Sequence, residues 1–477
     1  MNFSIDQVIA IAKGLNYKPL ERAEKWLERL AMNGPEFQAF EAFPEVANLS
    51  PYLAIPTHVE ALTTSNTKSF DAPRWKPRAG LEAGEGHKAF ISANALAFEG
   101  ASVPVAVKDL MRVKGFPLTG GTKETDMKNH TQEASIVSNL RGAGASIVAT
   151  TNLHELAYGV TSRNPHHQHV VNAVNPELTP GGSSGGSAVA VALGIVPFAI
   201  GTDTAGSIRI PAACNGVVGF KPSYGALSTQ GVISLGWSLD HVGPIAIDVE
   251  WTAWAFAAML GLKSFPDLAL WETQGLRLGF LGGYFEDPLE TICLEGLETT
   301  RQAASKQGYK VTTGLEVRYA DSAAAIQLLT LAPEATTYHL HRLYNQGEDL
   351  GEDVRVRLEA GLFLPGFVYP RAQAMRQAWG QSLNSLFDNH DILVTSTLRC
   401  LPPEKDAIQV TANGKTFAAH TAMTQLTMPF NLSGNPAITL PLPRFGNGLA
   451  AIQLIGRKGE DWRLLAVAKA LEARLKD

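Results

Sequence analysis

The residues best suited to chemistry gather in two glycine-rich segments of this sequence. The first is Pro180-Gly-Gly-Ser-Ser-Gly-Gly-Ser187, and the second is Gly201-Thr-Asp-Thr-Ala-Gly-Ser-Ile-Arg-Ile-Pro211. Glycines at this density let backbone N–H groups face a ligand without side chains in the way. The serines could act as nucleophiles if a base lies within hydrogen-bond reach. The two segments therefore indicate either anion binding or acyl transfer.

Nucleotide binding and a nucleophile elbow, two common interpretations of glycine-rich segments, fit poorly here. A phosphate-binding P-loop ends in Gly-Lys-Ser/Thr, and neither segment contains a lysine. Gly142-Ala-Gly144 resembles the start of a dinucleotide fingerprint, but it follows a helical pattern, and Ile147 occupies a position that requires a small residue. Gly181-Gly-Ser183-Ser-Gly185 matches a nucleophile elbow, yet a proline-bounded loop precedes it, and no later histidine stands in a recognisable context.

Taken with a distant lysine, the two segments resemble the amidase signature family. Its members carry a lysine at a strand end, a Gly-Gly-Ser-Ser-Gly-Gly-Ser loop and a Gly-Thr-Asp-x-x-Gly-Ser-Ile-Arg segment. The matching residues here are Lys108, Ser183 and Ser207, with the family's spacings of 75 and 24 residues. The resemblance is strong from about residue 100 to 250 and looser towards the C-terminus, where Asn431-Leu-Ser-Gly-Asn-Pro-Ala437 still matches.

The resemblance implies a proton relay for amide hydrolysis. Lys108 takes a proton from Ser183, which takes one from Ser207, and Ser207 attacks the amide carbonyl to form an acyl-enzyme. A lysine can act as a base only when it is neutral, and burial can lower its pKa from about 10.4. Lys108 ends an apolar run, so a buried amine is expected there. The resemblance also implies a cis peptide bond between Gly182 and Ser183.

Neighbouring residues are expected to support this chemistry. Backbone N–H groups at the turn that precedes Ser207 would form the oxyanion hole. The residues expected to line it are Thr204, Ala205 and Gly206. Ser184 is expected to hydrogen-bond within the site, and Asp203 and Arg209 to form an internal ion pair that braces the turn.

Other candidate ligands and nucleophiles are better explained as structural. His166-His-Gln-His169 has the wrong periodicity for shared metal ligation and is expected to be a solvated loop. Cys214 is expected to lie in the core, and the three cysteines are too few and too scattered for a disulfide framework or a zinc site. We therefore expect neither a metal nor a cofactor.

Length and composition exclude several classes of protein. The 477 residues are 45% hydrophobic and 18% charged, which suits a globular chain with a large core. A net charge of −5 gives no basic surplus for nucleic acid. The longest apolar run, Ala188 to Ile200, is too short for a membrane helix, and Met1 to Leu15 lacks the features of a secretory signal. We expect a cytoplasmic protein with a small-molecule amide substrate and no nucleic-acid or membrane partner; a homodimer is left open.

Alternating strand and helix patterns predict an α/β fold. We expect a single large domain with a mixed, mostly central β-sheet covered by helices on both faces, as in the amidase signature fold. The expected divisions are N-terminal helices and loops packing on the core over 1–95, the amidase signature domain over 96–477, and a helix-rich insertion at about 263–390. The predicted strands lie at 102–107, 146–150, 196–201, 391–395 and 437–440, and the predicted helices at 5–14, 20–31, 133–141, 188–193, 250–262, 287–307, 321–345, 350–360 and 371–388. Residues 50–95 are predicted to be mostly loop.

Three functions remain open at this stage. The chain could be a free-standing hydrolase of amides and related esters or carbamates, the glutaminase subunit of a tRNA-dependent amidotransferase, or a scaffold with a dead site. For the glutaminase, the resemblance implies an arginine and an aspartate that hold glutamine. Arg357 fits the arginine, but Thr424, followed by Gln425, stands at the acidic position. This missing acid disfavours the glutaminase, and the presence of all three catalytic side chains disfavours the dead site.

Overall fold

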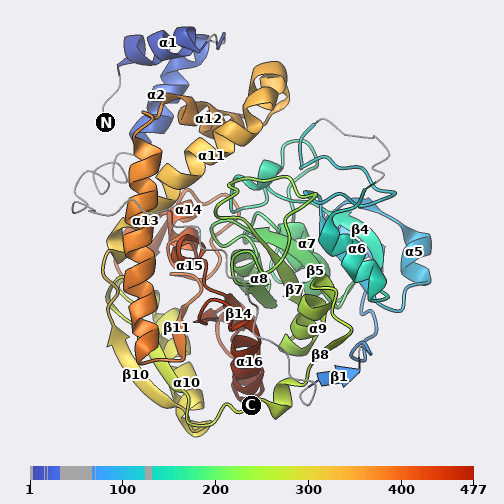
Figure 1. Ribbon diagram of the computed structural model, residues 1–477. Helices are drawn as coiled ribbons and strands as arrows, with labels where there is room; N and C mark the ends of the chain where they lie inside the picture. Colours follow the sequence, from blue (N-terminus) through green and yellow to red (C-terminus); the bar gives the residue numbers. More distant parts are fainter. Residues whose placement is uncertain are drawn as a thin grey trace.

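The computed structural model describes residues 4–15, 17–18, 20–32, 67–69, 71–123 and 132–476. Eleven described strands form one mixed sheet in the order β10-β9-β11-β15-β14-β6-β7-β5-β3-β4-β2 (Figure 1). Their bounds are β2 Phe90–Ala93, β3 Pro104–Lys108, β4 Ser146–Thr151, β5 Phe198–Asp203, β6 Val218–Lys221, β7 His241–Ala246, β9 Arg277–Leu281, β10 Lys310–Leu315, β11 Ile392–Ser396, β14 Ala437–Pro441 and β15 Ala451–Ile455. Two small strand pairs lie apart, namely β1 Thr67–Ser69 with β8 Ser264–Pro266 and β12 Gln409–Ala412 with β13 Lys415–Ala418.

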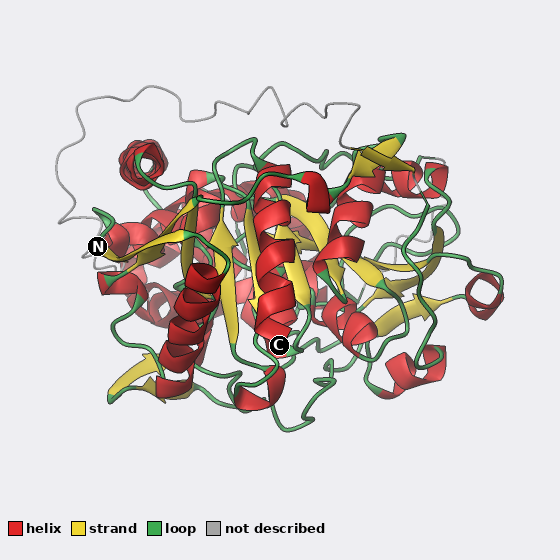
Figure 2. Ribbon diagram, turned by 90° about the horizontal axis from the view of Figure 1, so that it is seen from below, coloured by secondary structure: helices red, strands yellow, loops and turns green. Residues whose placement is uncertain are grey.

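Helices cover both faces of this sheet, as Figure 2 shows. Their bounds are α1 Ile5–Gly14, α2 Ala23–Met32, α4 Leu81–Gly86, α5 Ala95–Glu99, α6 Ser135–Gly142, α7 Gly185–Ala192, α8 Arg209–Cys214, α9 Val249–Met259, α10 Thr291–Lys306, α11 Ala323–Gln346, α12 Glu352–Ala360, α13 Val368–Ser385, α14 Ala419–Thr424, α15 Pro429–Ser433 and α16 Asp461–Lys476. The single α/β domain with a mixed central sheet is therefore confirmed.

The sheet is mixed because its strands enter it from both directions. β3 pairs in parallel with β4 and β5, which brings the ends of these strands to one edge of the sheet. β5 then pairs antiparallel with β7, and β7 with β6. The strand ends at Lys108 and Asp203 consequently lie close together, and the second glycine-rich segment continues from the end of β5.

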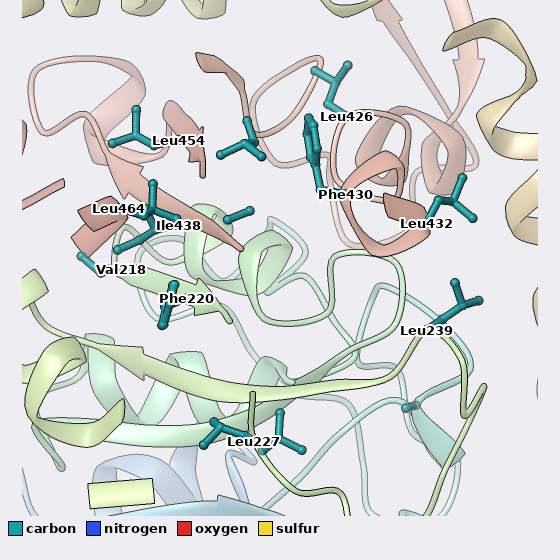
Figure 3. Packing of buried hydrophobic residues seen from close by; sticks show 14 of the residues in the cluster. Val218, Phe220, Leu227, Leu239, Leu426, Phe430, Leu432, Ile438, Leu454 and Leu464 are labelled. Carbon is teal, nitrogen blue, oxygen red and sulfur yellow. The ribbon is translucent and has the colours of Figure 1, made fainter. Parts of the chain in front are cut away.

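Apolar side chains of the strands and helices make up the core. Figure 3 shows Phe220 of β6, Ile438 of β14, Leu454 of β15 and Leu464 of α16 among the side chains of this cluster. All four are 0% exposed. At roughly 25 cal/mol for each Å² of apolar surface buried, such side chains supply the main favourable free energy of folding. This packing gives the site residues a rigid support.

The N-terminal helices dock on the core through one buried carboxylate. Glu359 of α12 is 0% exposed and accepts hydrogen bonds from Tyr17 at 2.8 Å, Arg22 Nη2 at 2.7 Å and Trp26 at 2.8 Å. Arg355 donates to it as well, at 2.9 Å. In Figure 1, α1 and α2 lie together at one end of the molecule, beside α12. A capping box opens α1, in which the side chains of Ser4 and Gln7 each accept the other residue's backbone N–H.

Some predicted elements differ from the structure. Residues 50–66 and 70 of the predicted loop lie outside the described residues, and the rest of it contains β1, α4, β2 and the start of α5. Strands β9 and β10 lie within the range 263–390 beside its helices and belong to the central sheet. Strands β6, β7 and β15 and helix α16 were not predicted. In the part of the chain that the structure describes, no helix is long and apolar enough to cross a membrane.

Candidate active site

Lys108 is the last residue of β3, and its side chain is 0% exposed. Its Nζ lies 2.7 Å from Ser183 Oγ, 2.9 Å from Ser184 Oγ and 2.8 Å from Thr202 Oγ1. Three hydroxyl groups therefore surround the amine.

Burial lowers the pKa of Lys108 from its ordinary value of 10.5 to about 7. Loss of hydration is the largest cause, since it penalises the charged ammonium. The carboxylates of Asp203 and Asp240 act in the opposite direction, but more weakly. A large part of the Lys108 population is thus neutral at physiological pH.

A neutral amine has two N–H donors and one lone pair for its three hydroxyl partners. Ser184 Oγ donates to the Thr202 carbonyl at 3.2 Å, so its oxygen is left to accept from Lys108. If Thr202 Oγ1 accepts the second N–H, the lone pair faces Ser183. In the contact of 2.7 Å, the Ser183 hydroxyl then donates a hydrogen bond to the amine nitrogen. This is the arrangement that a general base requires.

The glycine-rich loop holds Ser183 beside the lysine. The Gly182–Ser183 peptide bond is cis, as the family resemblance implies. A Cβ at position 182 would lie 2.8 Å from the Ser162 backbone nitrogen, so only glycine fits there. Ser162 Oγ accepts the Gly185 N–H at 3.0 Å, and the Ser183 carbonyl accepts the His154 N–H at 3.1 Å. The loop is fixed on two sides by the segment that follows β4.

Ser207 lies in the short turn between β5 and α8 and is 4% exposed. Its carbonyl accepts the Ser184 N–H at 3.3 Å, which joins the two glycine-rich segments. Among the described residues, the Lys108–Ser183 contact is present, but no hydrogen bond joins the hydroxyls of Ser183 and Ser207. The structure places the Lys108 amine against Ser183, and a backbone hydrogen bond joins the segments that carry Ser184 and Ser207.

Asp203 and Arg209 form the ion pair that the sequence predicts, with Nη2 and Oδ1 3.0 Å apart and both side chains 0% exposed. Asp203 also accepts the N–H groups of Gly206 at 2.8 Å and Ile208 at 3.2 Å. Asn431 donates to the same carboxylate at 2.8 Å. The Arg209 guanidinium, with further help from Asn431, keeps the pKa of Asp203 well below its usual range against the effect of burial. The Asp203 carboxylate therefore holds the backbone on both sides of Ser207.

The carbonyls of the turn before Ser207 are held by side chains from elsewhere in the chain. Gln327 of α11 donates to the Thr204 carbonyl at 3.0 Å, and Thr427 donates to the Ala205 carbonyl at 2.7 Å. The N–H of a peptide points away from its C=O, so Gln327 also fixes the direction of the Ala205 N–H. The Gly206 N–H is occupied by Asp203, which makes it a weaker candidate for the oxyanion hole than Thr204 and Ala205.

The remaining predicted positions serve other contacts. Arg357 of α12 donates to the Tyr158 carbonyl at 2.6 Å and to Asp353 at 2.8 Å. Thr424 Oγ1 donates to the His420 carbonyl at 3.0 Å, so this hydroxyl is used within its own helix. Cys214 is 0% exposed, and burial raises the pKa of its thiol.

The His166–His169 segment has dispersed partners. His166 contacts Glu155 at 3.1 Å, His167 the Thr122 carbonyl at 3.0 Å, and His169 accepts the Asn164 N–H at 3.0 Å. These histidines face different partners. In the described ranges, no group of three or more histidine, cysteine or acidic side chains could hold a metal ion.

Sequence reasoning missed several residues of this site. Thr202 lies within the segment quoted for the resemblance, and its hydroxyl touches the lysine, so the motif itself carried the signal. Asn431 also stands in a matching motif. Ser162, Gln327 and Thr427 reach the site only through tertiary contacts, and Thr427 is 222 residues from its partner.

The chain, with its mixed α/β sheet and a buried lysine beside paired serines, belongs to the amidase family. The family model described as Amidase matches residues 89–465. The chain is 32% identical over 396 residues to 1-carboxybiuret hydrolase subunit AtzE of Pseudomonas sp. (strain ADP). This match covers 79% of this chain and 85% of that protein. It is 30% identical to the A subunit of glutamyl-tRNA(Gln) amidotransferase from Shouchella clausii, covering 78% of this chain and 83% of the relative.

A solved structure described as that of an amidase has the same fold. It superimposes with a TM-score of 0.76 at 34% sequence identity and covers 83% of this chain and 94% of its own. Family membership and these relatives support an amide-hydrolysing enzyme. They do not single out one substrate, because subunits of a hydrolase and of an amidotransferase match this chain almost equally well.

Proposed function

We propose that this chain hydrolyses carboxylic amides through an acyl-enzyme on Ser207. The observation that carries the proposal is the contact of 2.7 Å between the buried Lys108 Nζ and Ser183 Oγ. An amine with a pKa of about 7 is a competent base near neutral pH, because catalytic bases work best when their pKa lies near the working pH.

The proposed reaction has two balanced halves. Ser207 Oγ bonds to the carbonyl carbon while its proton passes to Ser183, whose own proton passes to Lys108. Collapse of the tetrahedral intermediate breaks the C–N bond, and the proton returns through Ser183 to the leaving nitrogen, which departs as a free amine or ammonia. Water then repeats the attack by the same relay, and the products are a carboxylic acid and the restored Ser207.

The negative charge on the carbonyl oxygen needs hydrogen-bond donors. We propose the N–H groups of Thr204 and Ala205, with Gly206 contributing less because it already donates to Asp203. One such donor contributes roughly 3–4 kcal/mol to transition-state stabilisation. Asp203 and Arg209 act as positioning residues, because they hold the turn and touch no reacting atom.

The purified chain, assayed alone on a panel of aryl and alkyl amides and on glutamine, tests this proposal. We expect hydrolysis of the amides without added protein, and a loss of at least about 10³-fold in each of Lys108→Ala, Ser183→Ala and Ser207→Ala. Circular dichroism and size-exclusion chromatography check that these variants are folded. Full activity of the Ser207→Ala protein would discard the mechanism.

The glutaminase subunit is the second candidate, since a relative that matches at 30% identity is the A subunit of an amidotransferase. Arg357 matches the arginine that the family resemblance implies for this subunit, whereas Thr424 supplies no carboxylate for the ammonium group of glutamine. Glutamine hydrolysis that appears only after partner subunits are added would favour this alternative. The dead-site scaffold predicts no turnover on any amide.

A further inference from the structure

We propose that a cavity beside Lys108 binds the amine part of the substrate, so that the enzyme cleaves N-substituted amides whose leaving group is a compact aryl- or alkylamine. This inference rests on the proposed function. It adds that the bulky group of the substrate lies on the nitrogen side of the scissile bond.

The cavity adjoins both the relay and the oxyanion turn. Its volume is about 240 Å³, and Thr202 and Thr204 form part of its wall. Thr202 Oγ1 is also the hydroxyl that lies 2.8 Å from Lys108 Nζ. An apolar cavity of roughly 150 Å³ suffices for benzene. The cavity therefore accepts one aromatic ring with a short substituent.

The wall of the cavity suits an uncharged, apolar group. Val232, Ile233, Leu235 and Val242 supply most of its apolar side chains. Mostly apolar walls with few polar groups are typical of sites that bind small organic ligands.

Asp240, the acidic residue of the wall, is already engaged, whereas His241 Nε2 is buried without a hydrogen-bond partner among the described residues. Asp240 accepts hydrogen bonds from Thr204 Oγ1 and Ser234 Oγ, each at 2.7 Å, and from two backbone N–H groups. Burial lowers the pKa of His241 well below its ordinary value, so its ring stays neutral. The wall thus offers neither a free carboxylate for an ammonium group nor a cation for a carboxylate, which favours a neutral amine substituent.

Two aromatic side chains mark the open side of the cavity. Trp237 is 44% exposed and Tyr338 is 48% exposed, and both belong to the lining. Their rings offer flat faces to a planar amine, and offset or edge-to-face ring pairs add about 0.5–1.5 kcal/mol beyond area burial. The released amine can leave on this side.

The path of the proton assigns the cavity to the amine rather than to the acyl group. In the proposed reaction, Ser183 returns a proton from Lys108 to the leaving nitrogen, so that nitrogen faces the relay. We place its substituent on the side of Thr202, which contacts Lys108 and also lines the cavity.

The test compares two substrates that each contain one phenyl ring, acetanilide on the amine side and 2-phenylacetamide on the acyl side. Val232→Phe places a ring into the cavity. We expect kcat/KM for acetanilide to fall by at least about tenfold, since pocket fit of this kind changes specificity by 10–200-fold, while 2-phenylacetamide changes less than about twofold. Val174→Phe is the matched control, because Val174 lines a separate hollow of about 410 Å³ and is 45% exposed.

A second variant keeps the inference falsifiable if Val232→Phe fails to fold. Val232→Ala enlarges the cavity and should raise the kcat/KM ratio of N-(2-naphthyl)acetamide to acetanilide by several-fold. Equal losses on both phenyl substrates in Val232→Phe, or a wild-type enzyme that cleaves 2-phenylacetamide but not acetanilide, would overturn the assignment and leave the amidase proposal intact. Absence of any Ser207-dependent amide hydrolysis would instead overturn the proposed function, and this inference with it.

Discussion

At the scale of single residues, the proposed mechanism depends on one lysine whose pKa is lowered by burial. Lys108 has no exposed surface, and its three nearest polar neighbours are hydroxyl groups rather than acids. The acids Asp203 and Asp240 act on it from farther away, and each is engaged by other hydrogen-bond donors. Removal of hydration therefore dominates the pKa of the amine.

This pKa predicts the pH dependence of activity. Above pH 7 the amine is neutral and accepts a proton, whereas below pH 7 it becomes an ammonium and cannot. With the Lys108 pKa at about 7, kcat/KM should be level at high pH and fall by about tenfold for each pH unit below 7. A pH–rate profile measures this. An activity that stays constant down to pH 5, with chemistry limiting, would rule out an amine base.

A neighbouring carboxyl group requires a control for that profile. Burial raises the pKa of Asp109 to about 7 as well, so its titration overlaps that of Lys108. Asn at this position can still accept the Thr119 N–H that Asp109 accepts at 3.0 Å. We expect Asp109→Asn to keep the inflection near pH 7, and its disappearance would assign the inflection to the carboxyl group instead.

At the scale of elements, the N-terminal helices are held on the core by Glu359. Removing one partner of a buried charge pair leaves the other charge uncompensated and costs about 3 kcal/mol or more. Glu359→Ala removes the carboxylate to which Arg22, Tyr17 and Trp26 donate. We therefore expect amide hydrogen exchange in α1 and α2 to accelerate by about 10²-fold, and exchange in β3 and α7 to stay unchanged. Glu352 also pairs with Arg22 but is 55% exposed, and Glu352→Ala should change exchange by less than about tenfold. Unchanged protection of α2 in Glu359→Ala would show that this carboxylate does not hold the helix.

The elements around the site were largely predictable, and those farther along the chain were less so. The strand ending at Lys108, the buried helix after the glycine loop and the strand before Asp203 all have strong apolar patterns. Strand β10 lies at the sheet edge and is mostly exposed, so its residues show no buried pattern that could separate it from a loop. Strands β6 and β7 are only four and six residues long and lie inside segments rich in glycine and proline, which hide strand periodicity.

At the scale of the whole molecule, spacing along the chain predicted the three side chains of the proposed mechanism but not their surroundings. Lys108, Ser183 and Ser207 stand in motifs whose separations are diagnostic of the family. Gln327 and Thr427 hold carbonyls of the same turn from 123 and 222 residues away, and no motif in the sequence marks those contacts. The cavity that we assign to the leaving amine also could not be predicted from local sequence, because its wall combines β7, the loop before it and α11.

The location of the covalent intermediate is the decisive test of the mechanism. A slowly deacylating p-nitrophenyl ester, quenched in acid and followed by peptide mass spectrometry, captures the acyl group on its residue. We predict one acyl group per chain on Ser207, formed at pH 8 and lost in Ser207→Ala, with Ser183 and Cys214 unmodified. An acyl group on Ser183 or Cys214, or steady turnover by the Ser207→Ala protein, would contradict it.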